Sequence, residues 1–463
     1  MKLDSITLKN FRCYEDLTVG LHPQLTVLVA NNGGGKTTLL DALRIGLWPF
    51  VGSFDLARSK FADPANAIAL DDVRLLSIER EMARQLPVNV VLTADYGLGQ
   101  KKWMRYRDSE AAGTHTKEDQ ETRDLKLFAA DLQVRVRDIE QVPVDLPVFG
   151  YYGTGRLYNE KRLTKNKTQA SQGEVVSQGI RTFGYLDCLD PASSYKQFEA
   201  WFISAFLKVR ESQIRQLEKR DVVEDIDPDI LGPVKVVQNV VDTVLNTTGW
   251  HKLEYSETYE KSLVLYHEQQ GVLKVNQLSD GIKNMLAMVA DIAYRCALLN
   301  RHMGVNAALR SRGVVMIDEV DMHLHPDWQQ TVISSLLKAF PNIQFIVTTH
   351  SPQVITTVPD DCIRILKDGD VYPAPKGTKG AESSRVLKRV FDVNVRPKDD
   401  ENTKLLNDYL DMVYADRWVE DPNVVSEARS ELDAIFVGEE PALTEADLYI
   451  ENRKWELELE KDQ

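Results

Sequence analysis

The chain has 463 residues, of which 43% are apolar and 27% charged, a composition typical of a globular protein with room for two or three lobes. Its net charge of −14 lies almost entirely in residues 397–463, where 20 acidic side chains face 7 basic ones. The nearly neutral remainder excludes a global attraction for nucleic acid, and the lack of a long apolar run or signal segment predicts a cytoplasmic protein without a membrane span.

The first predicted elements form an N-terminal lobe rich in strands. Residues 2–8 are predicted to form a strand that leads into Asn10, Phe11 and Arg12. Further on, residues 89–95 and 102–107 are predicted to form a hairpin, and residues 146–152 a buried strand. Together with the strand at residues 24–29, these segments favour a mixed sheet over a purely parallel one.

A glycine-rich turn joins the apolar strand at residues 24–29 to a helix that starts at Lys36. This turn follows the P-loop pattern, except that an alanine stands where the first glycine is usual. Glycines let backbone N–H groups turn toward phosphate oxygens, a lysine reaches the β- and γ-phosphates, and a threonine offers its hydroxyl to Mg²⁺. The alternative is a glycine-rich turn that binds no ligand. The residues concerned are Ala30, Asn31, Asn32, Gly33, Gly34, Gly35, Lys36 and Thr37.

The middle of the chain is polar and then helical. Residues 159–179 are predicted to form a loop with four basic side chains, either simply solvated or contacting phosphate or a partner. A helix is expected at residues 195–219 and another that opens at Pro233. Residues 263–266 and 272–275 are expected to form a second hairpin.

Two segments after this hairpin carry candidate chemistry. The sequence Leu-Ser-Asp-Gly at residues 278–281 begins a helix and could be no more than a capped helix start. Residues 313–319 form an apolar strand that ends in Asp318, suited to bind Mg²⁺, and Glu319, suited to deprotonate the attacking water. His323 and His325 lack a third ligand at metal spacing, so we do not expect them to bind a metal.

The last candidate residue is His350, which follows the buried strand predicted at residues 344–349. An imidazole at that strand end can hydrogen-bond a γ-phosphate. A single histidine is more often structural, but this strand is expected beside the one that bears the acids.

In this order the motifs resemble those of ATP-binding-cassette (ABC) ATPases, in the branch that contains SMC proteins, RecF and OLD-type ATPases. The resemblance implies an α/β P-loop head that binds ATP and Mg²⁺. It implies that Ser279 and Gly281 close on ATP held by a second copy, that Asp321 lies along the dimer seam, and that His350 is the switch histidine. It also extends nucleotide contacts to Asn10, Arg12 and Thr38.

The sequence departs from the family pattern in two places. Asp280 replaces the first glycine of the usual signature motif, which places a carboxylate near a phosphate and could slow or weaken closure. No clear glutamine loop is present, and residues 151–153 (Tyr-Tyr-Gly) are the best candidate for its position.

More narrowly, four segments are similar to the PtuA family, the ATPase subunits of Septu antiphage systems, also found beside some retrons. This resemblance implies a homodimer or larger homo-oligomer of ATPase heads that controls a separate HNH nuclease, PtuB, and reaches nucleic acid through that complex. The alternative is a RecF- or SMC-like repair ATPase that acts on DNA without a dedicated nuclease. The segments are LSDGIKNMLAMVADIAYRCALLN, LPVFGYYGTGRLY, RTFGYLDCLD and the acidic tail.

The expected organisation has four parts. Residues 1–158 form the N-terminal lobe of the head, 159–262 a loop and helical insertion, 263–395 the C-terminal lobe, and 396–463 an acidic helical tail. Three tail helices are expected, the third capped by Thr444, and their apolar stripes must pack on the body or on a partner. The stripes are Leu406, Leu410 and Val413; Val425, Ala428, Leu432 and Phe436; and Leu448, Trp455 and Leu459.

Overall fold

A computed structural model of the chain describes residues 1–57, 64–78, 81–97, 99–111, 114–138, 140, 142–155, 180–191, 195–218 and 227–461. They belong to two compact units, Met1–Val386 and Leu387–Gln463. Within the described ranges, no helix combines the length and the apolar character needed to cross a membrane. The polar loop predicted at residues 159–179 lies outside the described residues.

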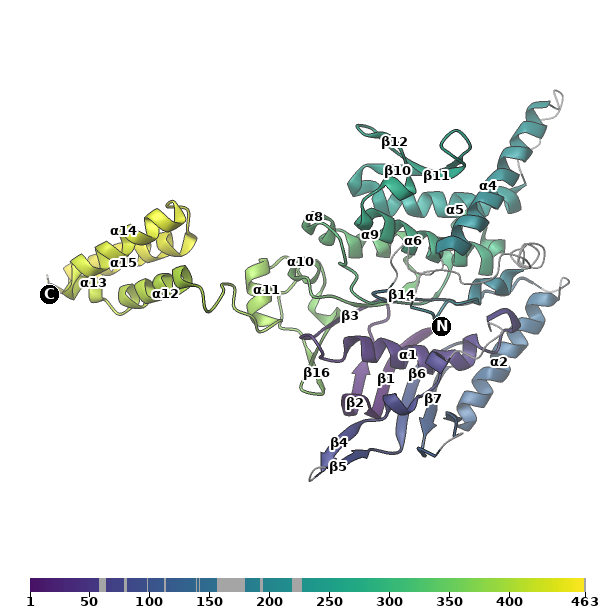
Figure 1. Ribbon diagram of the computed structural model, residues 1–463, viewed down its shortest axis with the longest axis horizontal. Helices are drawn as coiled ribbons and strands as arrows, with labels where there is room; N and C mark the ends of the chain where they lie inside the picture. Colours follow the sequence, from purple (N-terminus) through teal and green to yellow (C-terminus); the bar gives the residue numbers. More distant parts are fainter. Residues whose placement is uncertain are drawn as a thin grey trace. The chain divides into compact units, whose positions relative to one another are not determined.

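The larger unit contains a six-stranded sheet that carries the P-loop (Figure 1). Its strands are β3 (Leu25–Val29), β9 (Val148–Tyr152), β13 (Gly313–Ile317), β14 (Ile343–Thr348), β15 (Ile363–Lys367) and β16 (Asp370–Pro373). The order is β16-β15-β3-β14-β13-β9, with only the β15–β16 pair antiparallel, so the predicted mixed sheet is confirmed. Because parallel strands share a direction, β3, β13, β14 and β9 deliver the residues that follow them to one edge.

A second, antiparallel sheet contains the N-terminal strands and confirms the predicted hairpin. Its order is β2-β1-β6-β7-β8, made of β1 (Lys2–Phe11), β2 (Tyr14–Gly20), β6 (Val88–Asp95), β7 (Gln100–Arg107) and β8 (Lys117–Glu118). The backbone N–H of Leu3 donates to Oε1 of Gln344 at 2.8 Å, which joins this sheet to β14. A separate small hairpin is formed by β4 (Leu75–Ile78) and β5 (Glu81–Arg84).

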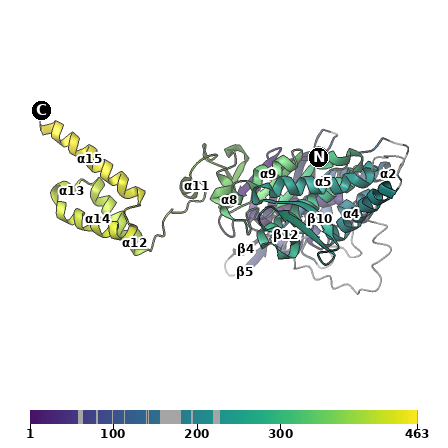
Figure 2. The same cartoon turned by 90° about the horizontal axis from the view of Figure 1, so that it is seen from above.

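The described residues of this unit include five long helices that pack around the sheets. They are α1 (Lys36–Val51), α2 (Gln120–Arg137), α4 (Tyr195–Glu218), α5 (Pro228–Leu245) and α6 (Asp280–Leu299). Helix α1 lies on the antiparallel sheet, where the indole N–H of Trp103 donates to the Gly46 carbonyl at 2.8 Å. Figures 1 and 2 both show α4 and α5 side by side, and both helices contact α6.

The predicted start of α5 at Pro233 is wrong. The helix begins at Pro228, where Asp227 accepts a hydrogen bond from the backbone N–H of Asp229, and Pro233 lies inside it. An Asp N-cap followed by a Pro at the first helical position is the stronger start signal, because that Pro gives up an N–H that has no helical partner. Pro233 lies within the first two turns of α5, and the valines that follow it are buried.

The remaining elements of this unit are short. A three-stranded sheet consists of β10 (Trp250–Ser256), β11 (Ser262–His267) and β12 (Gly271–Lys274). It confirms the second predicted hairpin and adds β10, which was not predicted. The short helices are α7 (Ala307–Arg310), α8 (Pro326–Gln329), α9 (Val332–Ala339) and α10 (Pro352–Ile355), and α11 (Ser383–Arg389) spans the boundary between the units.

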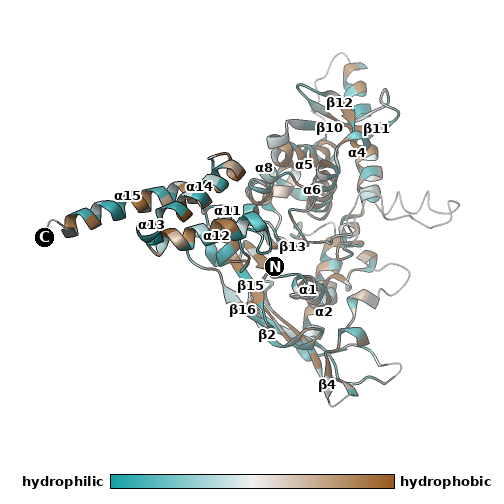
Figure 3. Ribbon diagram, turned by 60° about the vertical axis from the view of Figure 1, so that its left-hand side comes forward, coloured by the Kyte–Doolittle hydropathy of each residue, from teal (hydrophilic) through white to brown (hydrophobic). Residues whose placement is uncertain are grey.

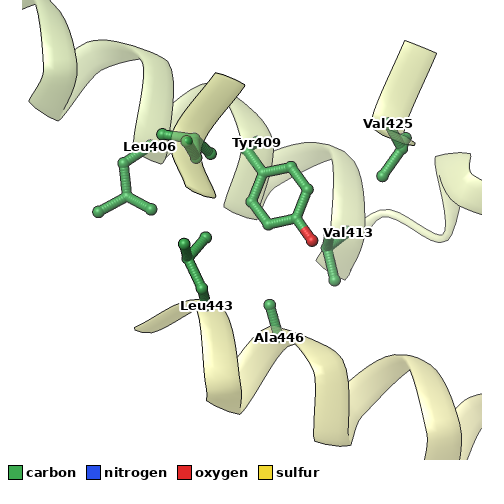
Figure 4. Packing of buried hydrophobic residues seen from close by; sticks show 7 residues of the cluster. Leu406, Tyr409, Val413, Val425, Leu443 and Ala446 are labelled. Atoms are coloured by element: carbon green, nitrogen blue, oxygen red, sulfur yellow. The ribbon is translucent and has the colours of Figure 1, made fainter. Parts of the chain in front are cut away.

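The smaller unit has a hydrophobic core of its own (Figure 4). Its helices are α12 (Glu401–Tyr414), α13 (Arg417–Glu420), α14 (Pro422–Phe436) and α15 (Pro441–Lys461). The first two predicted stripes supply Leu406, Val413, Val425 and Leu432 to this core. The predicted cap at Thr444 is wrong, because α15 begins three residues earlier, where the Glu440 carboxylate accepts from the backbone N–H of Ala442.

Candidate functional site

The P-loop joins β3 to α1, and two of its glycines, Gly34 and Gly35, stand where a side chain would not fit. A Cβ at Gly34 would lie 2.7 Å from the Cβ of Ala30. The methyl group of Ala30, which replaces the usual first glycine, therefore fits because Gly34 has no side chain. Gly35 has a φ of +84°, and a Cβ there would lie 2.1 Å from the Tyr14 hydroxyl oxygen. Asn31, Asn32 and Gly33 form the exposed tip of the loop.

Lys36 opens α1 and turns its ammonium group back onto the loop. Its Nζ donates to the carbonyl of Ala30 at 2.9 Å and lies 3.5 Å from the carbonyl oxygen of Asn31. Burial lowers the pKa of Lys36, while the nearby carboxylates of Asp318 and Glu319 oppose that shift. The ammonium is thus held at the base of the loop, where a phosphate could replace the carbonyl oxygens.

Thr37 and Asp318 come together from elements that are far apart in sequence. The Thr37 hydroxyl donates to Oδ2 of Asp318 at 2.8 Å, and the Thr348 hydroxyl donates to Oδ1 at 2.6 Å. A carboxylate and a hydroxyl in contact supply the hard oxygen ligands that Mg²⁺ prefers, so these residues fit the metal that the sequence implies.

Glu319 follows Asp318 in a left-handed backbone conformation, with φ of 49°. Its N–H donates to the Thr348 hydroxyl at 2.7 Å, so the same threonine fixes both acids. A non-glycine residue in this region is uncommon and directs its side chain differently from that of a regular strand. The turn therefore sends successive carboxylates in different directions.

Asp321 and His350 complete this edge. The Thr349 hydroxyl donates to Oδ1 of Asp321 at 2.5 Å. His350 follows β14, and burial together with the charge of Lys36 lowers the pKa of its imidazole, against the opposing effect of the nearby carboxylates. Lys36, Asp318, Glu319, Asp321 and His350 are thus electrostatic neighbours.

The predicted signature residues lie in a different pocket. Ser279 precedes α6 without a side-chain cap hydrogen bond, and a Cβ at Gly281 would lie 2.3 Å from the carbonyl oxygen of His323. A pocket of about 340 Å³ opens here, and its described lining includes no P-loop residue. The lining residues are Thr247, Thr248, Ser279, Gly281, Ile282, His323, His325, Asp327 and Trp328.

Two polar side chains near this pocket have partners within the protein. Asp280 is paired with Lys283 at 2.7 Å, which lowers the pKa of the Asp280 carboxyl. The imidazole of His325 accepts from the backbone N–H of Asp327 as the cap of α8. In the described part of the chain no three His, Cys, Asp or Glu side chains are grouped closely enough to hold a metal ion.

The residues predicted from the N-terminal segment have protein partners. The Asn10 amide donates to the carbonyl of Pro87 at 3.1 Å. The Arg12 guanidinium donates to Asp41 on α1 and to Asp72, both at 2.8 Å. Arg12 therefore braces the helix that carries Lys36. Sequence reasoning did not single out Asp41 or Asp72, because neither belongs to a recognised motif.

Thr38 has a neighbour that sequence reasoning also missed. The thiol of Cys13 is hydrogen-bonded to Thr38, and its partial burial raises its pKa. Its sulfur would lie 3.0 Å from a Cβ at Gly35. An accessible thiol thus adjoins the P-loop.

Comparisons with known proteins place these features in context. A family model for an AAA domain matches residues 5–230, and a second AAA-domain model matches residues 193–356. The chain is 30% identical to the "Retron Ec83 probable ATPase" of Escherichia coli, over all of this chain and 89% of that protein. It is 24% identical to the "Retron Vc95 probable ATPase" of Vibrio cholerae serotype O1 biovar El Tor, over 80% of this chain and 74% of that protein.

Two further comparisons are more distant. "Septu protein PtuA" of Bacillus thuringiensis is 22% identical over 46% of this chain and 49% of that protein. Among solved structures, the SMC head domain of Thermotoga maritima aligns with a TM-score of 0.40 and 14% identity, over 81% of this chain and 100% of that domain.

Proposed function

The chain belongs to the family of retron ATPases related to Septu PtuA, and we propose that this ATPase acts as a switch whose complete hydrolytic sites form only between two copies. Each copy would supply the P-loop and the acids of one site and the signature residues of the other. ATP would bring the two surfaces together, and its hydrolysis would release them.

The observation that carries this proposal is the separation of two half-sites within one chain. Lys36, Thr37, Asp318 and Glu319 share one edge of the six-stranded sheet. Ser279 and Gly281 instead line a pocket whose described residues include none from the P-loop. A signature segment that faces its own open pocket can act on a nucleotide presented by another copy.

At the first half-site each residue has a distinct task. Lys36 exchanges the carbonyls of Ala30 and Asn31 for phosphate oxygens, and Thr37 with Asp318 would hold Mg²⁺, which neutralises charge on the phosphates. Glu319 orients and deprotonates the attacking water. His350, with its lowered pKa, is neutral near pH 7 and can hydrogen-bond the terminal phosphate.

The finer role that we propose is control of a nuclease in antiphage defence. The names of the relatives connect the family with retrons and with Septu. The partner would be an HNH nuclease of the PtuB type, and nucleic acid would be reached through that complex. Residues 397–463 carry 20 acidic and 7 basic side chains, which suits a basic protein surface as the docking partner.

Replacing Glu319 by Gln tests this function directly. Glu319→Gln should retain ATP binding and lower the turnover number by about 10² or more, because the base is lost while the phosphate contacts remain. The ATP-bound dimer should then accumulate, as measured by light scattering with and without ATP. Glu211→Gln, at a side chain on α4 that is 62% exposed, is the control and should hydrolyse ATP normally. Undiminished hydrolysis by Glu319→Gln would contradict the assignment.

A further inference from the structure

Strand β9 ends in two tyrosines whose hydroxyl groups bind helices on opposite faces of the sheet. Adjacent residues of a strand point to opposite faces. Tyr151 donates to Oδ1 of Asp41 on α1 at 3.2 Å, and Tyr152 donates to Oδ2 of Asp291 on α6 at 2.8 Å. Figures 1 and 3 show α1 and α6 on the two sides of this sheet. The end of β9 therefore ties the P-loop helix to the signature helix.

The contact with α6 is a buried ion pair with several hydrogen bonds. Asp291 and Arg295 are 2% and 3% exposed, and Nε of Arg295 donates at 2.8 Å to the oxygen that accepts from Tyr152. Arg295 Nη1 also donates to the carbonyls of Gly184 and Leu186, at 2.7 and 3.1 Å. Buried charges persist only when they are paired and hydrogen-bonded, so this arrangement fixes the rotation and height of α6 against β9.

The backbone of Tyr152 makes the second half of the connection. The N–H of Asp318 donates to the carbonyl of Tyr152 at 2.8 Å, directly after the register pair of Ile317 with Tyr152. Tyr152 thus holds the acid of the first half-site through its carbonyl group and the signature helix through its hydroxyl group. Ser279 is the N-cap of α6 and Asp291 lies within the same continuous helix, so a shift of the helix along its axis moves both residues.

We propose that Tyr152, Asp291 and Arg295 are positioning residues that transmit the position of the signature helix to Asp318. The inference rests on the proposed function, in which α6 moves when two copies dock. It adds that this movement reaches Asp318, the acid that would hold Mg²⁺. When α6 is drawn toward a second copy, the ion pair moves with it and shifts the end of β9. The carbonyl of Tyr152 then moves the backbone of Asp318 relative to Thr37. Docking of the two half-sites and placement of the Mg²⁺ ligands thereby become one event.

Tyr152→Phe is the test, and Tyr185→Phe is its matched control. Tyr185 is also fully buried, and its hydroxyl donates to the carbonyl of Pro147 at 2.9 Å, a hydrogen bond that involves neither Asp318 nor α6. In Tyr152→Phe we expect kcat to fall about tenfold and the half-saturating Mg²⁺ concentration to rise about tenfold, as for other groups that orient metal ligands. KM for ATP should change by less than about twofold, since the P-loop contacts remain. Tyr185→Phe should change none of these values.

Hydrogen exchange provides a readout that needs neither nucleotide nor turnover. Without ligands, the amide of Asp318 should exchange faster in Tyr152→Phe than in the wild type, and at the wild-type rate in Tyr185→Phe. If Tyr152→Phe does not fold, Arg295→Lys, which keeps the charge but loses the multiple donors, should show the same pattern.

Each result separates this inference from the proposed function. Wild-type values of kcat, Mg²⁺ requirement and Asp318 exchange in folded Tyr152→Phe or Arg295→Lys would overturn the inference and leave the ATPase switch intact. Equal effects in Tyr185→Phe would also overturn it, because the role would then be structural. Absence of Mg²⁺-dependent hydrolysis in the wild type would overturn the proposed function, while the exchange measurement would still report on the connection.

Discussion

Gly35 is constrained by both its backbone and its surroundings. Its φ of +84° is unfavourable for any residue with a side chain, and a Cβ would lie 2.1 Å from the Tyr14 hydroxyl oxygen. Gly369, in the turn between β15 and β16, has a similar φ of +86° but nothing within 4 Å of its Cβ position. Alanine at Gly369 would therefore suffer only the unfavourable backbone angle, whereas alanine at Gly35 would suffer that angle and a steric clash.

We expect Gly35→Ala and Gly369→Ala both to lose about 1–2 kcal/mol of unfolding free energy through the left-handed backbone. Gly35→Ala should also displace Tyr14 and the loop, and should therefore lose ATP binding at least about tenfold, whereas Gly369→Ala should bind ATP as the wild type does. Denaturant unfolding and titration with a fluorescent ATP analogue measure the two effects. Equal ATP affinity in the two variants would show that the loop tolerates the methyl group.

At the same scale, the sequence predicted which residues are candidates but not which of them touch. The spacing of the P-loop and the position of Asp318 after an apolar strand led to the Thr37–Asp318 pair. The partners of Arg12 and Tyr152 could not be predicted, because they depend on which helix lies over which strand. Arg12 and Asp41 lie 29 positions apart and Tyr152 and Asp291 lie 139 apart, so neither hydrogen bond leaves a local sequence pattern.

Among the elements, three buried parallel strands were predicted, whereas two helix starts and one strand were missed. The strands ending at Val29, Ile317 and Thr348 have apolar runs that admit little else, and the structure confirms them. The starts of α5 and α15 were missed, because Asp227 and Glu440 cap these helices earlier than the residues chosen. Strand β10 was missed because its exposed and buried residues do not alternate clearly.

The tail helices contain one apolar stripe that their own core does not use. Leu448, Trp455 and Leu459 on α15 are 55%, 70% and 52% exposed, and hydrophobic residues recur along this helix in Figure 3. Trp455 and Leu459 follow Leu448 by seven and eleven residues, so the three side chains share one face of the helix. Leu406, by contrast, is fully buried in the core of the tail.

A comparison of Leu406→Ala with Trp455→Ala distinguishes folding of the tail from docking. Leu406→Ala should destabilise the tail by about 2–5 kcal/mol through a cavity, measured by denaturant unfolding. Trp455→Ala should change stability by less than about 0.5 kcal/mol, yet weaken binding to the proposed nuclease by ~2 kcal/mol, about 30-fold. Calorimetric titration measures that affinity, and both variants should keep ATP hydrolysis. Undiminished nuclease binding by Trp455→Ala would remove this face from the interface.

For the whole molecule, the two half-sites predict which pairs of inactive variants can recover ATP hydrolysis when they form mixed dimers. A chain with Lys36→Ala contributes a defective P-loop half, and a chain with Ser279→Arg contributes a defective signature half. In a dimer of one Lys36→Ala and one Ser279→Arg chain, both defects fall in the same composite site. The second site then contains two intact halves.

Lys36→Ala and Ser279→Arg should therefore each be inactive alone and regain activity when mixed. With random pairing in an equimolar mixture, about a quarter of all composite sites are intact, so about a quarter of wild-type hydrolysis is expected. Mixing Lys36→Ala with Glu319→Gln is the control, because both residues belong to the same half-site and no intact site can form. Steady-state ATP hydrolysis of the mixtures measures the outcome. A complete site within each chain would give no recovery in either mixture, because every chain would then carry its own defect.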